Sequence, residues 1–172
     1  MSRAFVKEDD AGEPPIIPPR AALPPGTPNY VTPQGLAQLR AELTDLETVR
    51  TRTEANREDE ANRTRQLTIL NGQLSALTSR LASAKVVDPR SQPPNEVRFG
   101  ATVTLRTRSG SKNQERRFTI VGVDEASIAD GKVAFVAPIA RAVLGARLGQ
   151  KVTLRLGRVE EIAEVVNITY ES

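Results

Sequence analysis

Residues 32–46 read TPQGLAQLRAELTDL and begin a helix whose apolar pattern returns later in the chain. Thr32 can cap the first turn with its hydroxyl, and Pro33 stands at the first helical position, where its missing N–H costs nothing. The leucines that follow alternate in spacing between three and four residues: Leu36, Leu39, Leu43 and Leu46. This spacing predicts a helix with one apolar stripe, arranged as a heptad seam.

A second seam of the same kind follows: Leu67, Leu70, Leu74, Leu77, Leu81 and Ala84. Two seams so close in one chain predict an antiparallel helical hairpin over residues 32–85. Residues 51–66, TRTEANREDEANRTRQ, have only alanines as apolar residues, so no hydrophobic force closes the distal part. Pairing the helices in register places the turn at residue 59, with acidic side chains at the tip: Glu58, Asp59 and Glu60.

The segments on either side of the hairpin have different compositions. Residues 1–31 are rich in proline, which predicts an extended, flexible leader, with a polyproline ligand at residues 15–18 as the alternative. Residues 86–96 form a linker with three prolines. From residue 97 to 172 the pattern changes to alternating strands with one short helix over 139–146. The sequence therefore predicts an α+β protein with a small β-rich C-terminal domain.

Composition excludes several classes of function. The chain has no cysteine and no histidine, which rules out disulfides, thiolate metal sites and Ser-His-Asp catalysis. Its 24 Lys and Arg against 21 Asp and Glu are too balanced to indicate a nucleic-acid binder by net charge alone. No run reaches transmembrane length, and we expect a cytoplasmic protein.

Several stretches resemble the Gre family of bacterial transcript cleavage factors. Residues 29–43, NYVTPQGLAQLRAEL, resemble the start of that family's first coil helix, which begins Thr-x-x-Gly-x-x-x-Leu. Residues 137–154, APIARAVLGARLGQKVTL, resemble its C-terminal motif Ser-Pro-Ile-Ala-Arg-Ala-Leu-Leu-Gly. Three further stretches fit as well: VVDPR at 86–90, VRFGATVTL at 97–105 and FTIVGVDEA at 118–126. The resemblance covers residues 30–170.

The resemblance implies a fold and a partner. The fold would be an N-terminal antiparallel coiled-coil hairpin followed by an FKBP-like C-terminal domain. The protein would be an accessory factor and not an enzyme, a monomer that binds the core of bacterial RNA polymerase at its secondary channel and contacts nascent RNA only indirectly. The matching residues of the C-terminal motif would dock on the polymerase: Pro138, Ile139, Ala140, Arg141, Leu144 and Gly145.

The resemblance also implies a role for the hairpin tip. Gre factors place two tip acids, spaced Asp-x-x-Glu, beside the polymerase active centre, where they help hold a second Mg²⁺ and a water that cuts backtracked RNA. The corresponding candidates here are Glu58, Asp59 and Glu60, which would share Mg²⁺ with the polymerase. We expect no tightly bound cofactor.

The chain departs from the family pattern at several places. Its tip region has no Asp-x-x-Glu and no glycine, and its arms are a turn or two shorter. Each missing helical turn withdraws the tip by about 5.4 Å, whereas a magnesium ligand must lie within about 2.1 Å of the ion. In the docking motif Ala137 replaces the usual serine, and Gln150 replaces an aspartate.

Three interpretations follow. The favoured one is a polymerase binder that modulates paused or backtracked elongation complexes without stimulating cleavage. The second is an active cleavage factor that uses the tip acids, and the third is a coiled-coil adaptor that does not bind polymerase. Basic residues around the first predicted β-hairpin would meet an acidic polymerase surface or nucleic acid, or only solvent: Arg106, Arg108, Lys112, Arg116 and Arg117.

Overall fold

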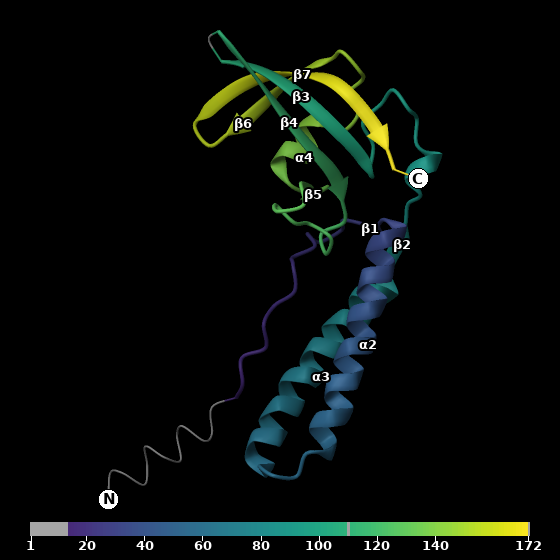
Figure 1. The fold of residues 1–172 in the computed structure, drawn as a ribbon, viewed down its shortest axis with the longest axis vertical. Helices are drawn as coiled ribbons and strands as arrows, with labels where there is room; N and C mark the ends of the chain where they lie inside the picture. Colours follow the sequence, from purple (N-terminus) through teal and green to yellow (C-terminus); the bar gives the residue numbers. More distant parts are fainter. Residues whose placement is uncertain (1–13, 110, 172) are drawn as a thin grey trace, which may run out of the picture.

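The computed structural model describes residues 14–109 and 111–171, in which a long helical hairpin extends from one side of a curled sheet (Figure 1). The hairpin and its base contain β1 (Asn29–Val31), α2 (Pro33–Ala55), α3 (Glu60–Ser83) and β2 (Ala84–Val86). The 3₁₀ turn η1 (Pro89–Ser91) leads to the sheet. The sheet part contains β3 (Ala101–Ser109), β4 (Lys112–Val121), β5 (Lys132–Ala134), α4 (Pro138–Val143), β6 (Lys151–Leu156) and β7 (Val159–Tyr170). The coarse prediction of an α+β protein is confirmed. No helix in the described ranges is long and apolar enough to span a membrane.

The start of α2 has the expected cap. The hydroxyl of Thr32 accepts a hydrogen bond from the Gly35 N–H at 3.0 Å, and Pro33 occupies the first helical position. The leucines of the two predicted seams pack together near the base of the hairpin, in a cluster of Val31, Leu36, Leu39, Leu43, Leu46, Leu77, Leu81 and Ala84. Residues 40–69 contain no buried side chain. Apolar packing therefore closes the base of the hairpin, and polar contacts must shape its tip.

The sheet has the strand order β5-β4-β3-β7-β6, and all neighbours are antiparallel except the parallel pair β4 and β5. Opposite the consecutive residues Thr104 and Leu105 of β3, β7 has one extra residue, Val166, and this bulge bends the pairing of the two strands. Alternate side chains of β3, β4, β6 and β7 fill the core, including Val103, Leu105, Ile120, Leu154 and Val165. Helix α4 packs against β6 and contributes the fully buried Ala140 and Val143 to the same core.

A buried carboxylate joins the hairpin to the sheet part. Glu125, in the loop after β4, is 6% exposed and accepts hydrogen bonds from the Thr32 hydroxyl and from the Thr32 N–H at 3.2 Å. The N–H of Gly122 also donates to it, at 3.4 Å. A buried carboxylate is costly unless donors surround it, and here the donors come from both parts of the chain. Glu125 therefore fixes the first turn of α2 against the sheet part.

An aromatic cluster supports the same junction. Tyr30 in β1, Phe99 before β3 and Phe135 after β5 have ring centroids 5.5–5.8 Å apart, with tilted or edge-to-face geometry. Such arrangements are favourable beyond the apolar area that they bury. They add packing to the polar contact at Glu125.

The proline-rich segment, which we expected to be a flexible leader as far as residue 31, lies along the hairpin from residue 14 (Figure 1). Its last residues form β1, which pairs in parallel with β2, and the side-chain amide of Asn29 donates to the Arg80 carbonyl at 2.9 Å. Arg20 binds carboxylates on both the hairpin and the sheet part. The segment is extended because of its prolines, but specific polar contacts hold it. The predicted polyproline stretch 15–18 lies in this segment. Residues 1–13, the first part of the predicted leader, lie outside the described residues.

We predict that Gly35→Ala destabilises the protein, although alanine is the better helix former by about 1 kcal/mol. A Cβ at position 35 would overlap the Glu125 carboxylate, so we expect the free energy of unfolding to fall by about 1–3 kcal/mol. Chemical denaturation measures this change. In a Glu125→Ala background the same substitution should be neutral or stabilising. An equal loss in both backgrounds would show that Glu125 is not the group that excludes a side chain.

We also predict an alkaline loss of stability that depends on Tyr170. Its hydroxyl donates to the Glu96 carbonyl and accepts from the Arg98 N–H, and burial raises the pKa of this phenol. A tyrosine whose pKa is raised by folding stabilises the folded state fully at pH values below its pKa in the unfolded chain, about 10. This stabilisation is lost as the pH rises through its pKa in the folded protein. The free energy of unfolding should therefore fall more steeply above about pH 10 in the unmodified protein than in Tyr170→Phe. Parallel profiles would contradict this assignment.

Candidate functional site

The tip of the hairpin is a short turn between Ala55 and Glu60, in agreement with the predicted position near residue 59. The carboxylate of Asp59 accepts from the Asn62 N–H at 3.1 Å and caps α3. On the other side, the Asn56 side chain accepts from the Glu58 N–H at 3.1 Å. These bonds hold the turn without glycine or proline because side-chain oxygens satisfy the free N–H groups.

The three tip acids have different roles in this turn. Asp59 caps the helix, and Glu60 lies 3.7 Å from the Arg63 guanidinium. The carboxylate of Glu58 has neither a hydrogen bond nor an ion pair with any residue that the structure describes. All three acids are exposed. Arg63 pairs with Glu60 and not with Asp59, because the Asp59 carboxylate faces the backbone of its own helix.

The three tip acids do not by themselves supply the ligands that a magnesium ion requires. Carboxylate oxygens are suitable donors for Mg²⁺, but the ion requires about six oxygen ligands. Among residues 14–109 and 111–171, no three acidic side chains gather closely enough to hold a metal. An ion at the tip would need most of its ligands from another molecule, with Glu58 as the unengaged donor.

Helix α4 and the two residues that follow it carry the predicted docking residues and divide them between a buried and an exposed side. Ala140 is fully buried, and Ile139 and Leu144 are partly buried against the core. Pro138 and Arg141 are exposed, as is Gly145, whose N–H donates to the Val97 carbonyl at 2.8 Å. Ala140 therefore supports the fold and cannot contact a surface partner. The exposed residues and the accessible parts of Ile139 and Leu144 are available for docking.

The substitution of alanine for serine at position 137 changes the start of α4 without displacing it. Ala137 is the N-cap and makes no side-chain hydrogen bond, whereas Pro138 still occupies the first helical position. The positive φ of Gly145, 85°, closes the segment after the helix. Arg141 and Pro138 border a shallow hollow together with Thr153 and Arg155 of β6. The loop-to-helix turn is thus preserved.

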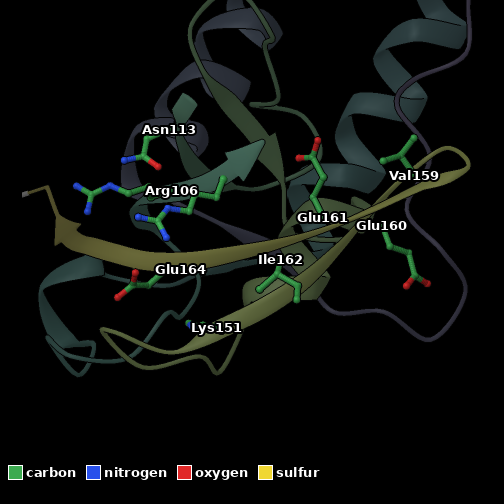
Figure 2. Close-up of a pocket in the computed structure, with 9 residues that line it drawn as sticks. Arg106, Asn113, Lys151, Val159, Glu160, Glu161, Ile162 and Glu164 are labelled. Carbon is green, nitrogen blue, oxygen red and sulfur yellow. The ribbon is translucent and has the colours of Figure 1, made fainter. Parts of the chain in front are cut away.

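The open face of the sheet carries charges of alternating sign across four strands. In register order they are Glu115, Arg106, Glu164 and Lys151. Three of them, Arg106, Glu164 and Lys151, line the hollow in Figure 2. Arg106 lies 3.2 Å from Glu115, and Arg155 lies 3.3 Å from Glu160 further along. Opposite charges on directly paired residues stabilise a sheet. The alternation also cancels most of the local field.

This alternation alters the interpretation of the predicted basic cluster. Arg106 is paired with Glu115, and Arg116 lies 4.0 Å from Glu161. The side chains of Arg108, Lys112 and Arg117 are exposed. A surface with interleaved acids attracts phosphates weakly. The face favours a solvated sheet over a nucleic-acid interface.

Sequence reasoning missed the acids that position the hairpin, Asp124 and Glu125. Asp124 binds Arg20 at 3.1 Å and Arg80 at 3.0 Å, and its side chain is 6% exposed. The available signal was a pair of acids directly after the apolar strand FTIVGV. Acids in that position usually mark a solvated turn, so the pattern alone did not indicate burial.

Comparison with known proteins agrees with this architecture. The family model for the C-terminal part of transcription elongation factor GreA/GreB matches residues 92–170. Transcription elongation factor GreB of Pseudomonas aeruginosa is 37% identical over 166 residues, which cover 89% of this chain and 95% of that protein. GreA of Thermodesulfovibrio yellowstonii is 30% identical over 155 residues, covering 82% and 96%.

The solved structures that match share less sequence with this chain. GreA factor homolog 1 of Thermus thermophilus is 17% identical with a TM-score of 0.37, covering 81% of this chain and 97% of that one. GreA/GreB from Nitrosomonas europaea is 22% identical with a TM-score of 0.39, covering 82% and 98%. The match to GreB of Pseudomonas aeruginosa spans hairpin and sheet alike, at an identity well above chance. The chain belongs to the GreA/GreB family of transcription elongation factors.

Proposed function

We propose that this protein binds bacterial RNA polymerase at the secondary channel and modulates the elongation of paused or backtracked complexes. One observation carries the proposal: the similarity to a GreB at 37% identity extends over both the hairpin and the sheet part, so both are retained. The hairpin would act as an antiparallel coiled-coil probe. The curled sheet with its single short helix would act as an FKBP-like docking domain. The protein would be an accessory factor without a catalytic site of its own.

The exposed side of α4 is the proposed docking surface. Arg141 and Pro138 are exposed there, while Ala140 and Val143 anchor the helix in the core. An arginine presented on a rigid element can bind a carboxylate of a partner through two parallel hydrogen bonds. The adjacent hollow, bordered by Thr153 and Arg155, extends this surface onto β6.

The tip favours modulation over cleavage. Asp59 is engaged as a helix cap and Glu60 pairs with Arg63, which leaves Glu58 as the free carboxylate. Releasing Asp59 from the cap would cost about 1 kcal/mol before it could bind an ion. A hairpin of this kind would occupy the channel and exclude other factors without completing a second metal site. It would hold no tightly bound cofactor.

The second candidate is a cleavage factor in which the tip acids share Mg²⁺ with the polymerase. The exposure of Glu58, Asp59 and Glu60 at the extreme end of the hairpin favours it. Carboxylates brought to the polymerase active centre would supply oxygen ligands to a second metal ion and orient water. The polymerase would provide the remaining ligands.

A backtracked elongation complex distinguishes the two candidates. We predict that the protein binds the complex and produces no increase, or less than about a twofold increase, in 3′ RNA cleavage over polymerase alone, because one free carboxylate cannot hold the second metal ion. Gel analysis of labelled RNA measures the rate. Cleavage that rises strongly and is lost when Glu58, Asp59 and Glu60 are all changed to alanine would establish the second candidate. A failure to bind core polymerase would support the adaptor interpretation instead.

We predict that Arg141→Ala weakens binding to core polymerase by about tenfold, as expected for an exposed arginine at the centre of an interface. Arg158→Ala, in the exposed turn between β6 and β7, is the matched control and should leave the affinity unchanged. Fluorescence anisotropy of labelled protein gives both dissociation constants. Equal affinities in the two variants would remove α4 from the interface.

A further inference from the structure

The proline-rich segment 14–28 forms one wall of a groove whose other walls are α2, α3 and the loop after β4. The groove is lined by Glu42, Leu46, Gln73, Ala76, Val123 and Asp124, and the segment contributes Pro18, Pro19, Arg20 and Ala21. Both arms of the hairpin and the sheet part therefore contact the same stretch of extended chain. The elongation function proposed above does not account for this segment.

Arg20 makes the central contact. Its two terminal nitrogens donate to the two carboxylate oxygens of Glu42 at 2.9 and 2.7 Å, and its Nε donates to Asp124 at 3.1 Å. The arginine side chain is 20% exposed and that of Asp124 is 6% exposed. These hydrogen bonds, chiefly those to Glu42, raise the pKa of Arg20 above its ordinary value. A bidentate pair with a second buried acceptor is much stronger than a single surface ion pair.

Arg80 of α3 completes the contact from the other arm. It binds the second oxygen of Asp124 at 3.0 Å and also donates to the backbone carbonyl of Ala21. Asp124 thus receives one guanidinium from the segment and one from the hairpin. Because all of these groups are interlinked, displacing the segment would leave Asp124 and Glu42 with fewer partners.

The segment has a second, apolar contact nearer the hairpin tip, where α3 provides a seat for Ile17. A Cβ at Gly72 of α3 would overlap the side chain of Ile17. The glycine therefore provides the space in which Ile17 rests against the helix. Pro18 and Pro19, which follow directly, keep the chain extended and lower the conformational entropy that is lost on binding.

We propose that residues 14–28 form an intramolecular strap that locks the hairpin onto the sheet part. The group that the strap presents for binding is an arginine in an extended, proline-flanked chain. Glu42 on α2, Arg80 on α3 and Asp124 after β4 form its receptor. With the strap bound, rotation of the hairpin about the Glu125 contact would break the Arg20 bridge between Glu42 and Asp124. The proposal does not depend on what the hairpin binds.

Limited proteolysis of the full-length protein tests the strap. Trypsin cleaves after Arg20, because Ala21 follows it, and only when the guanidinium leaves its carboxylates. We expect Glu42→Ala to increase the cleavage rate at Arg20 by about tenfold, since it removes the bidentate partner. Asp45→Ala, which removes the same charge one turn further along α2, is the control and should not change the rate. Mass spectrometry identifies the site, and cleavage after Arg106 in β3, which is paired with a strand on each side, reports any general unfolding.

Gly72→Ala provides a second variant, which should disturb the strap without destabilising α3. Alanine favours α3, so the hairpin should remain folded. The loss of the Ile17 seat should nevertheless increase cleavage at Arg20 several-fold while cleavage at Arg106 stays constant. Equal rates at Arg20 in the unmodified protein, Glu42→Ala and Gly72→Ala, all as fast as in a free peptide of residues 14–28, would overturn the proposal.

A distance measurement decides the matter if either variant unfolds. The chain has no cysteine, so Ala22→Cys and Ser75→Cys, both exposed positions, can carry a unique pair of spin labels. Double electron–electron resonance should give one narrow distribution of distances between the two labels, and this distribution should broaden in Glu42→Ala. A broad distribution in the protein with Glu42 intact, matching that of an unbound leader, would refute the strap.

Discussion

The buried carboxylate of Glu125 is the contact on which the geometry of this molecule depends. It lies where α2, a helix of 23 residues, meets the small curled sheet, and it accepts hydrogen bonds from both the hairpin and the sheet part. A carboxylate in such a place is unfavourable without donors, so the cap of α2 and the loop after β4 must remain together. Gly35 follows from the same constraint, because a side chain there would occupy the space of Glu125. The aromatic cluster of Tyr30, Phe99 and Phe135 then packs around a junction that is already oriented.

The hairpin changes character along its length. Leucines near the base pack into a cluster, whereas residues 40–69 have no buried side chain. Distally, helix propensity and the caps at Asn56 and Asp59 maintain the turn. The result is an arm with a fixed base and a polar, exposed end. Such an arm suits a channel in a larger enzyme, where solvated side chains meet polar walls without an apolar surface to bury.

Much of this fold follows from local sequence signals. Thr32 and Pro33 indicated the start of α2, and pairing of the leucine seams placed the turn within a few residues of its observed position. These signals are reliable because a cap and a heptad seam act between residues that are close in sequence or related by simple symmetry. The family resemblance, based on the hairpin start and the APIARAVLG stretch, is confirmed.

The remaining features depend on contacts between distant residues. The sequence could not show that Arg106 lies between Glu115 and Glu164, because strand register is set by pairing across the sheet. Nor could the sequence show which residues of the docking motif are buried and which are exposed. In a helix of six residues, only packing against β6 decides that Ala140 is inside and Arg141 outside. Likewise Arg20 reads as one cation in a proline-rich leader until Glu42 and Asp124, 22 and 104 residues away, are brought beside it.

A site-specific crosslink tests the central claim, that the hairpin enters the secondary channel of RNA polymerase, most directly. Because the chain has no cysteine, Glu58→Cys can carry a single photoreactive group at the tip. On a backtracked complex the account predicts crosslinks to polymerase segments that line the channel near the active centre, or to the RNA 3′ end, and their loss in Arg141→Ala. Crosslinks confined to the outer surface of the polymerase, or none from a protein that binds it, would contradict the account.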